Sequence, residues 1–445
     1  MISEYLIQAA QLLTGLSLLI VLHELGHFLP AKRFGVRVEK FYLFFDIKKS
    51  LIKKKIGETE YGIGWLPLGG YVKLSGMIDE SMDTEALKEP AKPWEFRAKP
   101  AWQRLIIMLG GVTVNLILGM FIYGMTLWIW GENYISIENA KYGVHVSELA
   151  QEIGFQDGDQ VKSIDGVPVS EDFTYGDFQQ EFLLNSEIKQ VTVENNGIER
   201  IVERPNEFAK SFLKQGKRGG LMSIRTPVVV DSVIAGKGAE AGGVLKGDQI
   251  VAVDDTATLF FGDVVRALQH RKDQDIALSV VRNSDTLLLT AHVSETGKLG
   301  FGNQGPSSFF EISIKSYTFL EAIPGGVNKA FSILGSYIDQ FKLVFTKEGI
   351  TQIGGFGTLG SLYSSSWDWQ SFWSITAFLS LVLAFMNVLP IPALDGGHVM
   401  FLLYEVITGK KPPEKFMEVA QMIGIILLLS LLLFANGNDL LRLFK

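Results

Sequence analysis

The first apolar stretch of the chain ends in the pattern His23-Glu24-Leu25-Gly26-His27. Residues four positions apart lie on one face of a helix, so the two histidines can bind one divalent cation, for which we expect zinc. Glu24 lies beside them, where it can act as the general base for an attacking water. The alternative is a pair of core histidines with a glutamate that reaches the membrane surface. The spacing favours the metal site, because such groups at the end of a membrane span are costly unless they face metal, protein or water.

Composition narrows the class of protein. The chain has 445 residues, which is too long for one ordinary domain, and 47% of them are hydrophobic, which fits a mixture of membrane and soluble parts. It has no cysteine, so any metal must be bound by nitrogen and oxygen ligands. The net charge of −7 and the lack of a basic patch interleaved with aromatic residues argue against nucleic-acid binding. The first apolar stretch lacks the basic start of a signal peptide, so we expect it to be retained.

Four apolar segments predict an α-helical polytopic membrane protein with four transmembrane helices. We place these spans at residues 5–29, 105–130, 370–389 and 418–434. The segment 30–104 is rich in lysine and arginine, so the positive-inside rule places it in the cytoplasm. Both termini are then outside, the histidine pair lies toward the cytoplasmic end of span one, and a short cytoplasmic loop joins spans three and four.

The region between spans two and three is soluble in composition and contains an internal repeat. Residues 154–166 match residues 243–255, and each copy is a Gly-Asp turn followed by a strand with alternating apolar residues. The pattern resembles PDZ domains, so we expect two inserted PDZ-like β-rich domains at 131–225 and 226–305. The carboxylate-binding loop of peptide-binding PDZ domains is not evident, which favours a filtering or docking role over capture of a free C-terminus.

The rest of the chain is divided accordingly. Residues 1–130 and 367–445 form the two halves of the membrane core, and residues 306–366 connect them to the soluble region. The connecting segment contains an amphipathic pattern that predicts a membrane-surface or bundle-packing helix. Its apolar positions are Val327, Phe331, Leu334, Ile338, Phe341 and Phe345.

Residues 61–74 combine β-type residues with glycine and proline, which predicts a short membrane-associated β-hairpin. Two interpretations are open. The segment is either a loop packed on the membrane face, or a strand edge beside the metal that pairs with an extended peptide. In the second case Gly69, Gly70 and Tyr71 contact the substrate.

Polar and small residues within span two also need an interpretation. Gly110, Gly111 and Gly119 permit neighbouring helices to approach closely. Asn115 lies near the middle of the bilayer and needs a partner, and we expect it to serve helix packing rather than catalysis.

Two histidines leave zinc short of a catalytic ligand set, which usually has three protein ligands. Spans one and three run in the same direction, so Asp395 reaches the depth of the histidine pair. Prolines 390 and 392 interrupt the helix before it, and the two glycines after it allow close backbone approach. His398 is the alternative third ligand, and we favour Asp395.

Taken together, these motifs resemble those of the site-2 proteases, in particular the bacterial enzymes that regulate sigma E. The resemblance covers nearly the whole chain and rests on the motif in span one, Leu-Pro-Leu-Gly-Gly-Tyr-Val at 66–72, the tandem repeats, and Asn-x-x-Pro-x-Pro-x-Leu-Asp-Gly-Gly-His at 387–398. It implies that His23, His27 and Asp395 bind zinc, that Glu24 is the general base, and that Asn387 contacts the substrate backbone. The chain departs from the family pattern at residues 354–360, where it has Gly-Phe-Gly within a glycine-rich run.

The resemblance also implies partners and a location. It implies an enzyme of the bacterial inner membrane, embedded in the lipid bilayer, with periplasmic PDZ-like domains and an active site toward the cytoplasm. Its expected substrates are single-pass membrane proteins, such as an anti-sigma factor already cut outside the membrane, and remnant signal peptides. A membrane-anchored PDZ scaffold without activity would not need Glu24 and Asp395 together with the two histidines. A metal transporter would need ionisable residues through the depth of several spans.

Overall fold

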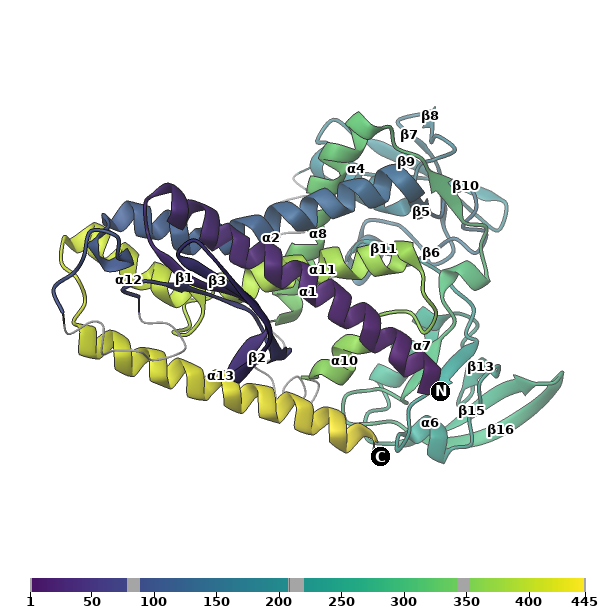
Figure 1. Ribbon diagram of the computed structural model, residues 1–445. Coiled ribbons are helices and arrows are strands. Elements are labelled where there is room, and N and C mark those ends of the chain that lie inside the picture. The colour runs from purple at the N-terminus through teal and green to yellow at the C-terminus, as the bar shows by residue number, and fades with distance from the viewer. Residues whose placement is uncertain (1, 78–88, 207, 209–219, 342–352, 444–445) are drawn as a thin grey trace. The chain divides into compact units, whose positions relative to one another are not determined.

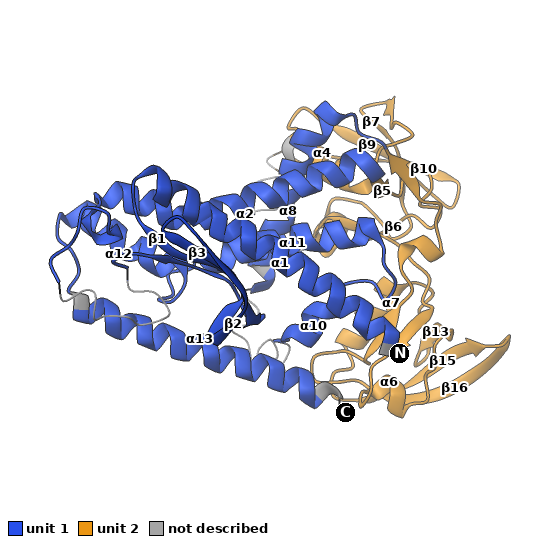
Figure 2. Cartoon of the chain, in the orientation of Figure 1, with its two compact units in different colours: residues 1–131, 316–444 blue, residues 132–315, 445 orange. Residues whose placement is uncertain are grey.

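The computed structural model describes residues 2–77, 89–206, 208, 220–341 and 353–443 (Figure 1). The chain divides into two compact units (Figure 2). Unit 1 combines residues 1–131 with residues 316–444, and unit 2 is formed by residues 132–315. Unit 2 is therefore inserted in the sequence between the two halves of unit 1.

The helices of unit 1 are α1 (Ile2–Arg33), α2 (Ala101–Trp130), α8 (Phe319–Phe341), α10 (Phe356–Gly360), α11 (Trp369–Val388), α12 (Asp395–Thr408) and α13 (Glu414–Leu443). Four of them, α1, α2, α11 and α13, are long and apolar enough to cross a membrane. This confirms the expectation of four spans. Helix α12 is a correction, because the sequence analysis treated this stretch as part of a loop. It ends at Gly409, whose left-handed conformation terminates the helix.

Helix α2 packs against α1, α8, α11 and α12. Three of these helix contacts depend on glycines of α2. The sequence analysis indicated two of these glycines, Gly110 and Gly119, and the third is Gly124. A Cβ atom on Gly110 would lie 1.9 Å from the carbonyl oxygen of Gly26 on α1, and one on Gly119 would lie 2.6 Å from Leu381 on α11. A Cβ on Gly124 would lie 3.1 Å from the carbonyl oxygen of Ala322 on α8. The neighbouring helices therefore pack close to the backbone of α2.

Two further segments complete the helical part. Helix α8 begins before the expected amphipathic segment and includes Pro324; Phe345, which the sequence analysis placed on the same face, lies outside the described residues. The glycine-rich run leads into α10, whose first N–H groups are bound by α13. Asp439 accepts hydrogen bonds from the backbone N–H groups of Gly355 and Thr358 at 2.9 and 3.0 Å. The run therefore has a packing role at the end of α13.

A four-stranded sheet lies between α1 and α2 in the sequence. Its strands are β1 (Val38–Leu43), β2 (Phe45–Ile56), β3 (Thr59–Leu66) and β4 (Tyr71–Leu74). Their spatial order is β2-β3-β1-β4, with β1 parallel to β3 and antiparallel to β4. The expected hairpin over residues 61–74 is therefore not formed. Strand β1 lies between the two strands that were assigned to the hairpin, because Phe41 pairs with both Tyr61 and Val72. Strand β4 is consequently an edge strand.

Unit 2 contains two halves that have the same order of elements. The first consists of β6 (Val144–Val146), α3 (Glu148–Glu152), β7 (Gln160–Ile164), β8 (Val167–Pro168), α4 (Tyr175–Leu184), β9 (Gln190–Asn195), β10 (Ile198–Glu203) and β11 (Met222–Ile224). The second consists of β12 (Val230–Val233), α6 (Gly238–Ala241), β13 (Gln249–Val253), β14 (Thr256–Ala257), α7 (Phe261–Gln269), β15 (Asp275–Arg282), β16 (Asp285–His292) and β17 (Phe301–Asn303). The sheet orders β8-β7-β9-β10 and β14-β13-β15-β16 correspond, as do the pairs β6–β11 and β12–β17. Strands β5 (Glu132–Tyr134) and β18 (Ser313–Lys315) pair where the chain enters and leaves the unit.

The repeated Gly-Asp turn has the same hydrogen bonds in both halves. Asp159 is fully buried and binds Arg200 at 2.6 Å, and Asp248 binds Arg282 at 2.7 Å. Each carboxylate also accepts a backbone N–H from the residue three positions earlier, at 2.8 Å. The hydrogen bonds from Arg282 hold the pKa of Asp248 below its usual range. The repeat in the sequence thus encodes a buried aspartate, paired with a partly exposed arginine, at the start of each central strand.

Candidate metal centre

Helix α1 carries His23, Glu24 and His27 on its inner side. Glu24 and His27 are buried, and the side chain of His23 is 12% exposed. Helix α2 leaves space for the two imidazole rings at Gly111. A Cβ atom on Gly111 would lie 2.4 Å from Nε2 of His27 and 2.6 Å from Cε1 of His23. A glycine at this position therefore leaves the space that the two rings occupy.

Asp395 comes from the other half of the chain and is the first residue of α12. The turn before it folds back on the helix, because a Cβ on Gly396 would lie 2.1 Å from the carbonyl oxygen of Leu389. Ala393 in this turn has a φ of 78°, which a non-glycine residue rarely adopts. Its N–H donates to Oε1 of Gln421 on α13 at 3.1 Å. Helix α13 thus holds the turn that positions Asp395.

The three side chains meet in one place. Oδ2 of Asp395 lies 3.2 Å from Nε2 of His23 and 3.4 Å from Nε2 of His27. The two Nε2 atoms are 3.3 Å apart, so one ligand atom from each residue faces the same point. His398, the alternative ligand, is not in this cluster of described residues.

The cluster fits a metal ion. Oδ2 of Asp395 is buried and makes no hydrogen bond among the described residues, despite the two imidazole nitrogens beside it. A buried carboxylate oxygen without a donor is destabilising unless a cation binds it. Two imidazoles and one carboxylate are a usual protein ligand set for catalytic zinc, which keeps a further coordination position open.

Backbone and side-chain groups orient both imidazoles. Nδ1 of His27 lies 2.8 Å from the carbonyl oxygen of Ile107, so it carries the proton and Nε2 is free to bind metal. Asn115 is fully buried, and its amide lies 3.2 Å from Nδ1 of His23. Its Oδ1 atom has no hydrogen-bond partner. Turning the amide over places Oδ1 at Nδ1 as an acceptor, which satisfies that oxygen and leaves Nε2 of His23 unprotonated.

The remaining predicted residues surround the cluster. Nδ2 of Asn387, near the end of α11, lies 3.4 Å from Nε2 of His23. Glu24 is close enough to both histidines and to Asp395 to interact with them electrostatically, and the backbone N–H of Val72 is close enough to stabilise its charged form. The edge strand β4 therefore has an N–H group directed at the cluster and away from β1.

Of the three predicted substrate-binding residues Gly69, Gly70 and Tyr71, one packs against α1. A Cβ on Gly70 would lie 2.5 Å from Ile20 and 3.5 Å from Cγ of Glu24, so the backbone of the sheet packs directly on this helix. Tyr71 is on the opposite face of the sheet and stacks between Tyr42 and Phe45, at ring distances of 5.4 and 5.9 Å. A Cβ on Gly69 would meet the ring of Phe45, not α1. Of the three residues, Gly70 is therefore the one nearest the cluster.

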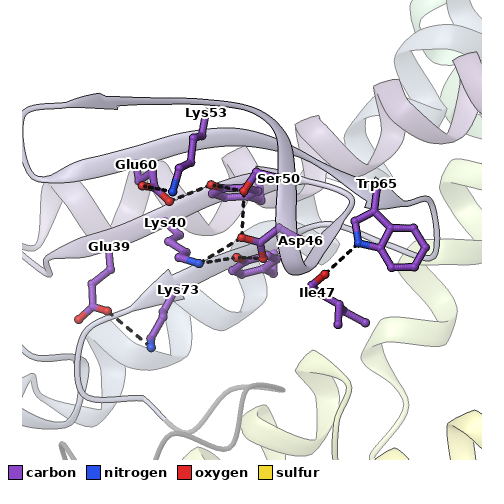
Figure 3. A network of polar contacts seen from close by, with 11 residues as sticks. Glu39, Lys40, Asp46, Ile47, Ser50, Lys53, Glu60, Trp65 and Lys73 are labelled. Carbon is purple, nitrogen blue, oxygen red and sulfur yellow. Dashed lines mark hydrogen bonds and ion pairs between the residues drawn. The ribbon is translucent and has the colours of Figure 1, made fainter.

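The hydroxyl of Tyr71 donates to Asp46 at 2.7 Å. Lys40 and Ser50 also donate to this carboxylate, at 3.2 and 3.3 Å (Figure 3). Burial opposes ionisation of Asp46, but the hydrogen bonds from Tyr71 and Lys40 hold its pKa below the usual range. The network connects the first part of β2 to the edge strand β4.

Several residues that shape the centre were missed or given another role. The sequence analysis expected Asn115 to serve helix packing; its backbone oxygen does accept from Ser380 on α11, but its side chain also contacts His23. The carbonyl of Ile107 carries no sequence signal. Gln421 was a polar residue in an apolar helix, and that was the signal that could have identified it. Two imidazoles, a carboxylate and an adjacent second carboxylate on membrane helices are the arrangement of a metalloprotease.

Comparison with known proteins agrees with this class. The profile of Peptidase family M50 matches residues 11–431. A protein of Neisseria meningitidis named as a candidate zinc metalloprotease is 28% identical, with 96% of this chain and 97% of that protein covered. The regulator of sigma E protease of Haemophilus influenzae is 26% identical, with coverage of 99% and 100%. Protease RseP of Yersinia pestis is 27% identical, with 98% of each chain covered. The chain therefore belongs to peptidase family M50, the site-2 proteases, and is a zinc-dependent membrane metalloprotease.

The close approach at Gly111 leads to a first prediction. We expect Gly111→Ala to lower zinc content and proteolysis, because the new methyl group overlaps both imidazoles and overpacking costs about 1–3 kcal/mol. The matched control is Gly335→Ala on α8, where a Cβ would meet nothing within 4 Å. Metal analysis and the cleavage rate of a single-span substrate are measured for both variants. A Gly111→Ala protein with normal zinc content and activity would show that the rings do not need this space.

Proposed function

We propose that the chain is an intramembrane endoprotease that cuts transmembrane segments of single-pass membrane proteins. The observation that carries the proposal is the buried cluster of His23, His27 and Asp395, which joins two membrane halves at one point. The Oδ2 atom of Asp395, which is buried and has no hydrogen-bond donor among the described residues, favours an active enzyme over a membrane-anchored scaffold, since a scaffold does not need such an oxygen beside two imidazoles.

The ligands and the base have separate roles in this proposal. His23, His27 and Asp395 would bind zinc, which supplies a Lewis acid that polarises the scissile carbonyl and lowers the pKa of a water. Glu24 then takes a proton from the attacking water and passes it to the leaving amine. Asn387, 3.4 Å from His23, would bind a backbone group of the substrate. Asn115 and the carbonyl of Ile107 keep the imidazole rings in the orientation that metal binding needs.

The edge strand β4 would hold the substrate in an extended form. A substrate helix hides its carbonyl groups in hydrogen bonds and must unwind before it can be cut. The N–H of Val72 points toward Glu24 and away from β1, so the free edge of β4 lies on the side of the reacting groups. Pairing with this edge would contribute about 0.5–1.5 kcal/mol per hydrogen bond, which offsets part of the cost of unwinding.

Topology and relatives suggest the substrates. The basic segment between α1 and α2 would be cytoplasmic by the positive-inside rule, which puts both termini and unit 2 on the periplasmic side of a bacterial inner membrane. Two relatives carry names that refer to RseP or to sigma E regulation. We infer that an anti-sigma factor, already cut outside the membrane, is one substrate of this chain, and that remnant signal peptides are a second.

Unit 2 would act as a size filter formed by two PDZ-like domains. Its halves have equivalent topology and equivalent Asp–Arg pairs, in which the aspartate is buried. It is attached at the end of α2 that is farthest from the metal centre, since the helix rises about 22 Å from Asn115 to Trp130. Substrates with bulky domains outside the membrane would be excluded, which explains a need for prior trimming.

The general-base role is tested with Glu24→Gln. We expect the variant to retain zinc and to lose about 10²–10⁴-fold in cleavage rate, because the amide cannot accept a proton. Asp395→Ala should lose both zinc and activity, whereas His398→Ala should retain zinc. Metal analysis and cleavage of a model single-span substrate are compared for the three variants. Normal turnover by Glu24→Gln would refute the base assignment, and zinc loss in His398→Ala alone would make His398 the ligand.

Proline at position 72 tests the substrate-pairing edge. Val72→Pro removes the N–H that points toward Glu24, whereas Val72→Ala keeps it. We expect Val72→Pro to slow cleavage of a stable substrate helix more than that of a substrate with helix-breaking residues, and Val72→Ala to affect neither strongly. Rates are measured at equal zinc content. Equal slowing of both substrates would mean that the change acts on Glu24 or on packing and not on substrate pairing.

Removal of unit 2 tests the filter. Tyr134 and Ser313 are directly paired, so a short Gly-Ser linker can replace residues 136–311 without separating the ends. We expect the shortened protein to cut a substrate whose outer domain is intact, which the full-length protein should leave uncut. Cleavage of intact and pre-trimmed substrate is compared in cells. If the inserted, zinc-loaded protein cuts neither, unit 2 is required for docking and the filter is refuted.

A further inference from the structure

Strand β2 begins with a large irregularity. Its regular pairing with β3 is interrupted between Phe45 and Ser50, so that residues 46–49 lie opposite a single residue of β3. We call residues 46–49 the bulge. Phe44, just before the bulge, and Lys48, within it, have φ angles of 66° and 65°, which side chains other than glycine rarely permit. Strain of this kind persists only where the surrounding contacts hold it.

Strand β3 provides the space into which this segment folds. Gly62 and Gly64 are two positions apart and therefore lie on the same face of the strand. A Cβ atom on Gly62 would overlap the ring of Tyr42, and one on Gly64 would overlap the carbonyl oxygen of Phe45. The chain that leads into the bulge therefore crosses β3 at backbone contact, on the face of the sheet turned away from α1.

The bulge brings a carboxylate to the edge strand. Asp46 is its first residue and belongs to β2, which β3 and β1 separate from β4. Oδ1 of Asp46 accepts a hydrogen bond from the hydroxyl of Tyr71 on β4 at 2.7 Å. Oδ2 accepts from Lys40 and Ser50 at 3.2 and 3.3 Å (Figure 3). The side chain of Asp46 is only 19% exposed, which strengthens these hydrogen bonds.

Tyr71 is held by its ring as well as by its hydroxyl. The ring stacks on Tyr42 and Phe45, with interplanar angles of 16° and 7°. The planar peptide unit that follows Tyr71 contains the N–H group of Val72. The contacts of Tyr71 on one face of the sheet therefore orient the N–H group that lies beside Glu24 on the other side of the strand.

Strand β4 needs such support. It has four residues and, within the described part of the chain, pairs only with β1. The register of this pairing is irregular between Val38 and Lys40. Short edge strands with few hydrogen bonds open locally at low cost. The loss of one tether should therefore loosen β4 before it loosens the rest of the sheet.

The alternative is that the polar network only stabilises the sheet. That accounts for the bonds of Asp46 to Lys40 and Ser50, but not for a strained segment that carries the carboxylate past two strands to the shortest one. We propose that Asp46 is a positioning residue of the protease, which holds Tyr71 and thereby orients the free edge of β4 beside Glu24. The expected effect on cleavage rests on the proposed pairing of substrate with β4, whereas the expected effect on β4 itself does not.

Amide hydrogen exchange tests the positioning without substrate. Exchange in β3 and in β4 is followed separately in the full-length, zinc-loaded protein, for wild type, Asp46→Leu, Tyr71→Phe and the double variant. Tyr71→Phe removes one oxygen and keeps the ring, so it tests the hydrogen bond even if Asp46→Leu does not fold. Asp46→Asn keeps an acceptor for the hydroxyl and serves as the rescue. Lys53→Gln is the matched control, because it changes a charge of β2 that pairs with Glu60 at 3.6 Å (Figure 3).

We expect Asp46→Leu and Tyr71→Phe each to accelerate exchange in β4 by about tenfold and to leave β3 nearly unchanged, because a hydrogen bond to a charged acceptor stabilises the closed strand by about this factor. The double variant should exchange no faster than the faster single variant, since both changes remove the same hydrogen bond. Asp46→Asn and Lys53→Gln should stay within about twofold of wild type.

Cleavage is the second readout, with the same two substrates that test position 72. At equal zinc content, kcat/KM of Asp46→Leu should fall about tenfold for the stable substrate helix and much less for the substrate with helix-breaking residues. Asp46→Asn should restore cleavage. A wild-type protein that cuts neither substrate would refute the proposed function, and exchange alone would then decide whether Asp46 positions β4.

Three results would overturn the proposal. The first is wild-type exchange in β4 of Tyr71→Phe. The second is an equal acceleration in β3 and β4, or additive effects of the two substitutions, either of which would assign the network to the stability of the whole sheet. The third is wild-type cleavage of both substrates by a variant whose β4 exchanges faster.

Discussion

The metal centre depends on the backbone contact between α1 and α2. Packed helices usually lie 8–10 Å apart, but Gly26 and Gly110 leave no room for even one Cβ between these two. At this separation a carbonyl of α2 reaches His27 and the side chain of Asn115 reaches His23. With bulkier residues at the crossing, both rings would lose their space and their orienting partners.

Asp395, the proposed third ligand, comes from a segment that is remote in sequence, and three contacts hold it. The turn after α11 packs on the first residues of α12, Gln421 binds the N–H of Ala393, and Glu405 of α12 forms an ion pair with Arg104 of α2. The two halves of the membrane core are separated in sequence by unit 2, so the centre can form only after both have packed. Such non-local contacts form late and slowly in folding.

Much of this architecture was accessible from the sequence, because the relevant signals are local. The helical period puts His23 and His27 on one face, and hydropathy marks the four spans. The strand order was not accessible, because the position of β1 between β3 and β4 depends on pairing across the sheet and not on the pattern within residues 61–74. The same holds for Asn115. A polar residue in a span signals a need for a partner, but only the packed structure shows that the partner is His23 of the candidate metal site.

Helix α13 is a membrane span with most of its surface turned away from the protein. Two positions in its first half face the turn that carries Asp395. Gln421 binds the turn before Asp395, and a side chain on Gly424 would collide with the carbonyl oxygen of Pro392 in that turn. The last span therefore combines two selective pressures. Its outward positions can exchange one aliphatic residue for another as membrane composition varies between lineages, whereas positions 421 and 424 are tied to the chemistry of a centre to which the helix contributes no ligand.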